Sequence, residues 1–363
     1  MGVLISNGNL LTVGGKLAIA NAAPATPYME AEYIEEVDID DNTTHYIKSA
    51  KLYNHTAIYT YEFAGQNQLK NLDFSDASNN ITAIETMAFN QALVHGLVLP
   101  NTISVLGAAC FASAYITTLA IPPLVTVLSR QAFSYIQPVY RNETGEELPI
   151  NIILPQNLTK IGNSCFEGAQ IKQITIPDTV TEIKDGAFSY CEQLASITLP
   201  LGLQKISDRV FAQCTSLTSI TIPAAVTMLG SDAFQGCESL TSMDIQANVT
   251  EIPDRFAVEC PLTSLTLPNT LQTIGALAFA AVSRFQVTEL TIPASVTSIG
   301  DNAFGSNNAN QMTLTVLPTT PPTLGKNAFN LATGSIIKVP AASVAAYKAA
   351  DGWKEYANCI VAM

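Results

Sequence analysis

The residues that can carry chemistry are few and match no known catalytic pattern. The chain has three histidines, His45, His55 and His95. They lack the spacing of a zinc protease and adjoin no nucleophile motif, and there is no GxSxG, GxxxxGK[ST] or GxGxxG sequence. The adjacent carboxylates Glu35–Glu36 and Glu146–Glu147 would point to opposite faces of a strand, which makes them poor acid/base pairs. We therefore predict no catalytic residue and no enzyme.

The cysteines indicate packing and not metal binding or disulfides. Seven is an odd number, which excludes a complete disulfide framework. Four recur at a constant interval, namely Cys191, Cys214, Cys237 and Cys260. Two others, Cys110 and Cys165, each precede a phenylalanine, and no CxxC or HxxxH pair brings metal ligands together. We expect small apolar side chains stacked in a core, with no metal site and no cofactor.

A repeat dominates the rest of the chain. Eleven phenylalanines follow one another at a nearly constant interval, apart from one longer gap: Phe89, Phe111, Phe133, Phe166, Phe188, Phe211, Phe234, Phe256, Phe279, Phe304 and Phe329. In most units an apolar residue and a proline follow, near the middle of the interval. Such a fixed period is typical of a solenoid, in which each unit buries its apolar face only against its neighbours.

One unit runs from Ile176 through Phe188 to Pro200. The segment before the proline alternates apolar residues with Thr and Ser, which predicts a short strand with one buried face. The stretch before Phe188 is too short for a full helix and favours one helical or 3-10 turn. The coil at Met243–Gln246 lacks its proline, which we interpret as a tolerated variation. We predict a mainly-β leucine-rich-repeat solenoid of 11–12 coils, each of about 22–25 residues, with short helical or 3-10 turns.

The motif Ile-Pro-x-x-Val-Thr-x-Ile-x-x-x-Ala-Phe-x-x-Cys-x-x-Leu-x-x-Ile-x-Leu-Pro resembles the BspA-type leucine-rich repeat, common in surface proteins of gut and oral Bacteroidetes. The resemblance covers roughly Glu62–Met363. It places the solenoid at residues 61–340 and a closing cap at 341–363, with a short helix over 342–350 and with Trp353 and Tyr356 packed on the last coil. A cap keeps the last strand edge from pairing with other chains.

Residues 1–60 lack the period and are predicted to be an attachment or oligomerisation segment. Asn7-Gly8 and Gly14-Gly15 within Leu4–Ala18 favour a hairpin or extended arm. The acidic stretch from Glu30 to Asp41 lacks the central Gly and closing Glu of a calcium loop, and we interpret it as a solvated strand or loop. The segment also resembles the start of virion proteins from phages of gut Bacteroidetes.

The longer gap, between Phe133 and Phe166, contains an insertion at residues 138–148 that interrupts the repeat. Insertions in solenoids project as loops, and loops often carry binding residues. Tyr140, Arg141 and Glu143 are therefore candidate contact residues. The alternative is a hairpin that only decorates the surface.

The outward strand positions form a second candidate surface. Their side chains are mostly Thr and Ser, and the candidate binding residues among them are Thr198, Ser219, Thr221, Thr241, Thr263 and Thr266. Stacked in register they would present a nearly uncharged sheet of hydroxyls to a glycan or a protein. Thr also favours strands without any ligand, so a purely structural role stays open.

Composition and charge narrow the class of partner. The formal net charge is −13, with only 13% charged residues, which argues against nucleic-acid binding. No apolar run is long enough to insert into a membrane. Met1–Asn9 carries no Lys or Arg and Lys16 interrupts the following apolar residues, so we expect no cleaved export signal.

Two non-enzymatic functions follow. The first is a phage virion protein, in a tail, baseplate or head fibre, held to other virion proteins by residues 1–60 and displaying the solenoid to a host surface protein or glycan. The alternative is a bacterial cell-surface or secreted adhesin of the same repeat family. By analogy with fibres we expect a homo-oligomer, with a trimer as its form. A glycan-processing enzyme is a third hypothesis, which would need Glu146 or Glu147 to act.

Overall fold

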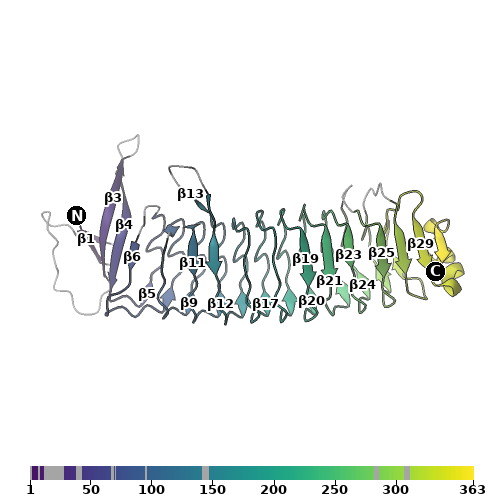
Figure 1. Cartoon of the computed structure of the whole chain (residues 1–363), viewed down its shortest axis with the longest axis horizontal. Coiled ribbons are helices and arrows are strands. Elements are labelled where there is room, and N and C mark those ends of the chain that lie inside the picture. Colours follow the sequence, from purple (N-terminus) through teal and green to yellow (C-terminus); the bar gives the residue numbers. More distant parts are fainter. Residues whose placement is uncertain are drawn as a thin grey trace. The chain divides into compact units, whose positions relative to one another are not determined.

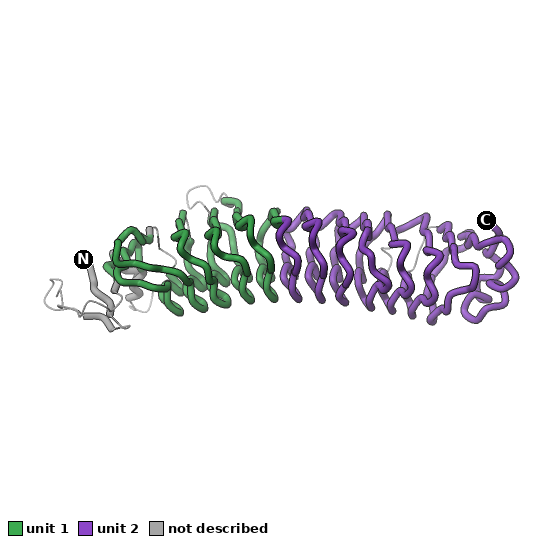
Figure 2. Tube along the Cα trace, turned by 90° about the horizontal axis from the view of Figure 1, so that it is seen from below, with its two compact units in different colours: residues 1–177 green, residues 178–363 purple. Residues whose placement is uncertain are grey.

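The computed structural model describes residues 2–6, 9–11, 28–37, 43–66, 69, 71–94, 96–140, 147–281, 286–305 and 311–363. The chain forms two compact units, Met1–Pro177 and Asp178–Met363 (Figure 2). Each is a stack of coils built from short parallel strands and turns, and together they contain about 13 turns with very little helix. The predicted mainly-β repeat solenoid is confirmed, but it has about 13 turns where 11–12 coils were predicted. Among the described residues, no helix is long and apolar enough to cross a membrane.

The first unit begins with a largely antiparallel sheet (Figure 1). Its strands, in the order β2-β1-β3-β4-β6, are β1 (Gly2–Ser6), β2 (Asn9–Leu11), β3 (Tyr28–Val37), β4 (Thr43–Tyr53) and β6 (Asn71–Asp73). Ser6 pairs with Asn9, which confirms the predicted hairpin. β4 pairs in parallel with β6, so the N-terminal sheet joins the strands of the first coil. The predicted acidic stretch forms part of β3, while Asp38, Asp40 and Asp41 lie outside the described residues.

The N-terminal sheet covers the first coil with apolar side chains. The buried ones on β3 and β4 are Met29, Ala31, Ile47, Ala50 and Leu52. A sheet with one dry face is what the open end of a repeat stack requires. The predicted domain boundaries at residues 60 and 340 stay a prediction.

The coils of the first unit carry short strands on two sides. One side contains β5 (Ala57–Ile58), β7 (Ala83–Ile84), β9 (Val105–Leu106), β12 (Val127–Leu128) and β16 (Lys160–Ile161). The other contains β8 (Leu93–Val94), β10 (Tyr115–Ile116), β11 (Thr118–Ala120) and β15 (Asn151–Ile153). The insertion forms an antiparallel hairpin of β13 (Val139–Tyr140) and β14 (Glu147–Leu148).

The second unit repeats this arrangement with longer strands on one side. The short strands are β17 (Glu182–Ile183), β18 (Lys205–Ile206), β20 (Met228–Leu229), β22 (Glu251–Ile252), β24 (Thr273–Ile274), β26 (Ser298–Ile299) and β28 (Thr323–Leu324). The longer strands are β19 (Ser219–Ile222), β21 (Ser242–Ile245), β23 (Ser264–Thr266), β25 (Glu289–Ile292), β27 (Thr313–Val316), β29 (Ile336–Val339) and β30 (Ile360–Ala362). Buried and outward residues alternate along them, as the sequence predicts.

The corner at each phenylalanine differs from the expected helical or 3-10 turn. Around Phe234 the backbone forms consecutive turns, with Asp232 and Gly236 at φ +56° and +68°. Alternate amides bond within the coil and to the next: Gln235 N–H to Asp232 O, but Phe234 N–H to Phe256 O (2.9 Å) and Gly236 N–H to Val258 O (2.9 Å). The left-handed residues allow this alternation, because a helical turn would direct its N–H groups along the coil.

The phenylalanine rings form a buried stack in each unit. Neighbouring rings lie nearly parallel, as between Phe89 and Phe111 (centroids 5.0 Å apart, 3°). The first unit extends the series to Phe63, which stacks on Phe89. Along the sequence Phe63 is slightly further from Phe89 than one repeat interval, and it was not among the predicted phenylalanines. Phe256 is the exception, crossing Phe234 at 77° and Phe279 at 83°. The order here is Phe256-Ala257 instead of Ala-Phe, so this ring enters from the alanine position.

The C-terminal cap matches the prediction closely. It comprises η1 (Ala341–Ser343), α1 (Val344–Ala349) and η2 (Trp353–Tyr356), followed by β30, which pairs with β29. Trp353 Nε1–H donates to Pro322 O (2.7 Å), Tyr347 O–H to Pro318 O (2.8 Å) and Tyr356 O–H to Phe329 O (2.6 Å). Each aromatic residue thus covers apolar surface and also satisfies a backbone carbonyl of the last coils.

Glycines allow adjacent coils to approach closely. A Cβ on Gly275 would lie 2.5 Å from the backbone nitrogen of Asp254 in the preceding coil, whereas one on Gly202 would meet only Asp178 O, at 3.4 Å. We predict that Gly275→Ala lowers the free energy of unfolding by about 1–3 kcal/mol, as overpacking does. Gly202→Ala, the matched control, should leave it unchanged or slightly raise it. Urea unfolding of both variants measures this, and equal stability would contradict the close-contact argument.

Candidate interaction surface

The predicted hydroxyl surface exists on the longer strands of the second unit. Thr198, Ser219, Thr221, Thr241, Thr263 and Thr266 are all exposed. Strand register arranges the face in two rows: a serine row of Ser219, Ser242 and Ser264, and a threonine row of Thr221, Asp244 and Thr266. A third row, here called the ladder row, lies one residue before the serine row and contains Thr218, Thr241 and Thr263.

The hydroxyls in these rows have different roles. In the ladder row, Thr241 Oγ1 donates to Thr218 O (3.3 Å) and Thr263 Oγ1 to Thr241 O (3.1 Å), so they link successive coils. The hydroxyls of Ser219, Thr221, Ser264 and Thr266 bond to no described residue. Of the predicted binding residues, Thr241 and Thr263 use their hydroxyls to link coils, whereas Ser219, Thr221 and Thr266 make no such bond. Ligand binding by any of them stays a prediction.

Asp244 replaces a threonine in the threonine row, and its side chain accepts a hydrogen bond from Gln246, which directly follows β21. Gln246 Nε2–H donates to Asp244 Oδ2 (2.8 Å). Gln246 stands where the adjacent coils have Pro223 and Pro268, and its backbone N–H donates to Ile222 O (3.0 Å). Proline has no N–H, so this bond is absent from coils that keep the repeat. The sequence marked this position only through the missing proline.

The insertion does not bring its predicted residues into a described site. Tyr140 lies on β13 opposite Glu147 of β14. Arg141 and Glu143 lie outside the described residues. Contact by this hairpin therefore stays a prediction.

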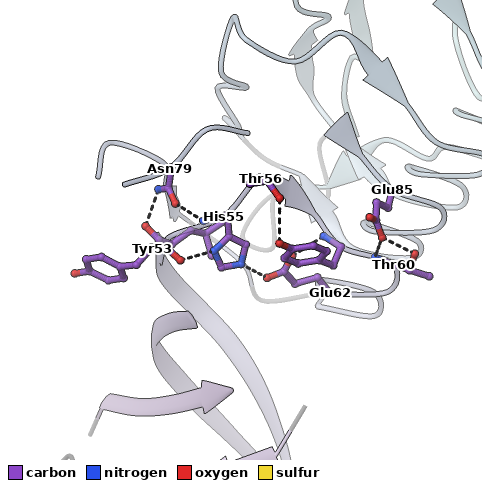
Figure 3. Close-up of polar contacts among 9 residues, drawn as sticks. Tyr53, His55, Thr56, Thr60, Glu62, Asn79 and Glu85 are labelled. Atoms are coloured by element: carbon purple, nitrogen blue, oxygen red, sulfur yellow. Dashed lines mark hydrogen bonds and ion pairs between the residues drawn. The ribbon is translucent and has the colours of Figure 1, made fainter. Parts of the chain in front are cut away.

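The buried histidine of the first coil is structural. His55 Nδ1 lies 2.9 Å from Tyr53 O, and Nε2 lies 2.8 Å from Glu62 Oε1 (Figure 3). Glu62 Oε2 accepts from Tyr59 N–H (2.7 Å), and Asn79 Oδ1 accepts from His55 N–H (2.9 Å). Both ring nitrogens therefore have a hydrogen-bond partner within the chain. The His55 side chain is only 3% exposed, which denies it the access to substrate that general-base catalysis requires.

The cysteines are free thiols, and all but the half-buried Cys359 are buried, as predicted. Cys214, Cys237 and Cys260 donate to the carbonyls of Phe188, Phe211 and Phe234 in the preceding coil, at 3.1–3.2 Å. Burial raises the pKa of the Cys110 thiol to about 12 and that of Cys214 well above its usual value. Thiolate, the nucleophilic form, is therefore disfavoured. In the described part of the chain, no three His, Cys, Asp or Glu side chains come together to hold a metal ion.

The His55–Glu62 pair gives a test of this structural role. His55→Ala leaves the largely buried Glu62 without its hydrogen-bond partner at Oε1, and we expect it to lower the free energy of unfolding by about 3 kcal/mol. Glu62→Gln can keep both bonds, since the new amide donates to a neutral His55 and its oxygen still accepts from Tyr59 N–H. We expect it to cost about 1 kcal/mol or less. Thermal unfolding of the two variants decides, and a larger loss in Glu62→Gln would contradict the assigned pairing.

The chain was compared with solved structures and with curated proteins. Similar solved structures include a leucine-rich repeat protein from Bacteroides ovatus (20% identity, 85% of this chain and 70% of that chain, TM-score 0.49). Others are a leucine rich cell surface protein from Faecalibacterium prausnitzii (19%, 85% and 96%, 0.39) and a leucine-rich repeat protein from Eubacterium ventriosum (18%, 80% and 94%, 0.39). No curated protein matches the chain.

A family model described as the BspA type leucine rich repeat region matches residues 34–140, 147–260 and 250–341, in six copies. These ranges span most of the chain and contain the stacked phenylalanines and the strands from β4 to β29. The chain belongs to the BspA-type leucine-rich repeat family.

Proposed function

We propose that this protein is a non-enzymatic recognition module that works at an extracellular surface and binds a host glycan or protein through the strand face of its second unit. The observation that carries the proposal is that the outward hydroxyls of β19 and β23, those of Ser219, Thr221, Ser264 and Thr266, have no partner among the described residues. Thr241 and Thr263 of the ladder row bond to the backbone, so the two sets differ in what they can offer a ligand.

The geometry of the face suits an extended ligand. Adjacent strands of a sheet lie about 4.8 Å apart, so each row repeats a hydrogen-bonding group at that spacing. A hydroxyl both donates and accepts, and many such bonds add up along a repeat surface although each contributes little. Solenoids commonly bind along their strand-lined side, and the repeat family here is one of surface proteins.

A matched pair of variants tests the role of the free hydroxyls. Ser219→Ala, Thr221→Val, Ser264→Ala and Thr266→Val combined remove the four outward hydroxyls of β19 and β23, and we expect binding to the target surface to fall at least about tenfold with stability unchanged. Thr241→Val with Thr263→Val removes two ladder hydroxyls, and we expect stability to fall by about 1 kcal/mol with binding unchanged. The readouts are adhesion of the labelled full chain to mucin-coated and epithelial-cell surfaces, and thermal unfolding.

The opposite pattern would overturn the assignment. If the ladder variant loses adhesion while the four-hydroxyl variant keeps it, the ligand does not use the serine and threonine rows. If neither variant changes adhesion, the binding site does not lie on this face.

We further propose two alternative locations, a phage virion or a bacterial cell surface. The N-terminal sheet favours an attachment role, because its strands β1 and β2 lie outside the residues that match the repeat family and β2, among the described strands, has a neighbour on one side only. In the virion alternative this segment binds other virion proteins, and the assembly is a homo-oligomer, with a trimer as the expected form.

Mass spectrometry separates the two locations. Purified phage particles should contain this chain if it is a virion protein, whereas protease shaving of intact bacterial cells should release its peptides if it is an adhesin. Absence from particles combined with release from cells rejects the virion alternative.

A further inference from the structure

Asp244 is the only charged side chain among the six residues of the serine and threonine rows. Strand pairing places it between Thr221 on β19 and Thr266 on β23, at the same register. It therefore lies in the middle of the hydroxyl face and not at a rim. A charge at that place affects every ligand that lies across the three strands.

The departure from the repeat at Gln246 positions this carboxylate. In the adjacent coils a proline ends the strand, but Gln246 supplies a backbone N–H to Ile222 O (3.0 Å) and thereby extends the strand pairing by one bond. Its side-chain amide donates to Asp244 Oδ2 (2.8 Å). Oδ1 has no hydrogen bond to a described residue. One substitution in the repeat therefore both extends the strand and orients an acceptor.

The chemistry of this group favours an uncharged saccharide. A carboxylate oxygen accepts from ligand hydroxyls in charge-assisted bonds, which are about twice as strong as neutral ones, and the flanking threonines can donate or accept. A carboxyl group on the ligand would meet Asp244 directly and the net charge of −13 generally. A metal ion is a poor alternative, because in the described residues no group of three metal-ligating side chains surrounds Asp244.

We propose that Asp244, oriented by Gln246, is the residue that makes this face specific for neutral glycans and that excludes anionic ones. This inference rests on the proposed function of the strand face. Asp244 contributes twice, by accepting hydrogen bonds from sugar hydroxyls and by repelling uronate or sulfate groups.

The test uses the full chain and defined polysaccharides. The probes are neutral β-glucan, mannan and xylan, and anionic polygalacturonate and hyaluronan, in affinity gel electrophoresis. We expect retardation by at least one neutral polymer and none by the anionic ones. Asp244→Asn should weaken binding to that neutral polymer about tenfold and permit binding of an anionic one.

Two further variants serve as controls. Glu289→Gln removes a single negative charge from β25, at the outward position that pairs with Thr313, and should leave selectivity unchanged. Gln246→Pro restores the residue of the adjacent coils and frees Asp244, and we expect it to weaken neutral binding by less than Asp244→Asn does. Thermal unfolding of each variant verifies that the fold is intact.

The outcomes separate this inference from the proposed function. If Asp244→Asn retains the affinity and selectivity of the natural chain while the four-hydroxyl variant loses binding, the face binds glycans and the assignment of Asp244 is wrong. Equal binding of neutral and anionic polymers by the natural chain also overturns it. If the natural chain binds no polysaccharide, neither the inference nor glycan recognition by this face holds.

Discussion

A coil of this protein buries its phenylalanine and satisfies its corner amides only through the coils on either side of it. Phe234 illustrates both halves of the constraint, because its ring packs on Phe211 and its N–H bonds to Phe256 O. Close spacing then requires glycine where the backbones approach, as at Gly275, and small thiols where cysteines stack. It also requires covers at the two ends, which the N-terminal sheet and the aromatic residues of the cap provide.

The same constraint divides the surface into residues that serve the stack and residues that do not. Thr241 and Thr263 lie where a hydroxyl reaches the carbonyl of the preceding coil, and so they link coils. Thr221 and Thr266 lie further along the strands, where no described acceptor is within reach. Binding specificity can change at such positions without loss of the fold, since the interior does not depend on them. Asp244 is a variation of this kind.

Polar groups that are buried inside the stack need hydrogen-bond partners within the chain. His55 uses both ring nitrogens and its backbone N–H, and Glu62 uses both carboxylate oxygens, so the pair closes on itself at the start of the first coil. A buried histidine beside a carboxylate is a familiar catalytic arrangement, but here every hydrogen-bonding position is occupied by the chain itself. Because the pair is buried and bonds to the chain itself, its role is to connect the N-terminal sheet to the coils.

The sequence by itself determined the repeat, the inward phenylalanines and cysteines, the capping aromatics and the outward Thr and Ser positions, because each follows from a period along the chain. Only the tertiary structure decided the left-handed corners, the crossed ring of Phe256, the division between free and ladder hydroxyls, and the bond from Gln246 to Asp244. Most of these depend on where a coil meets its neighbour, a full repeat away along the chain, and a local pattern does not report such distances. The Phe256-Ala257 order and the absent proline were visible in the sequence, but their consequences required the neighbouring coils.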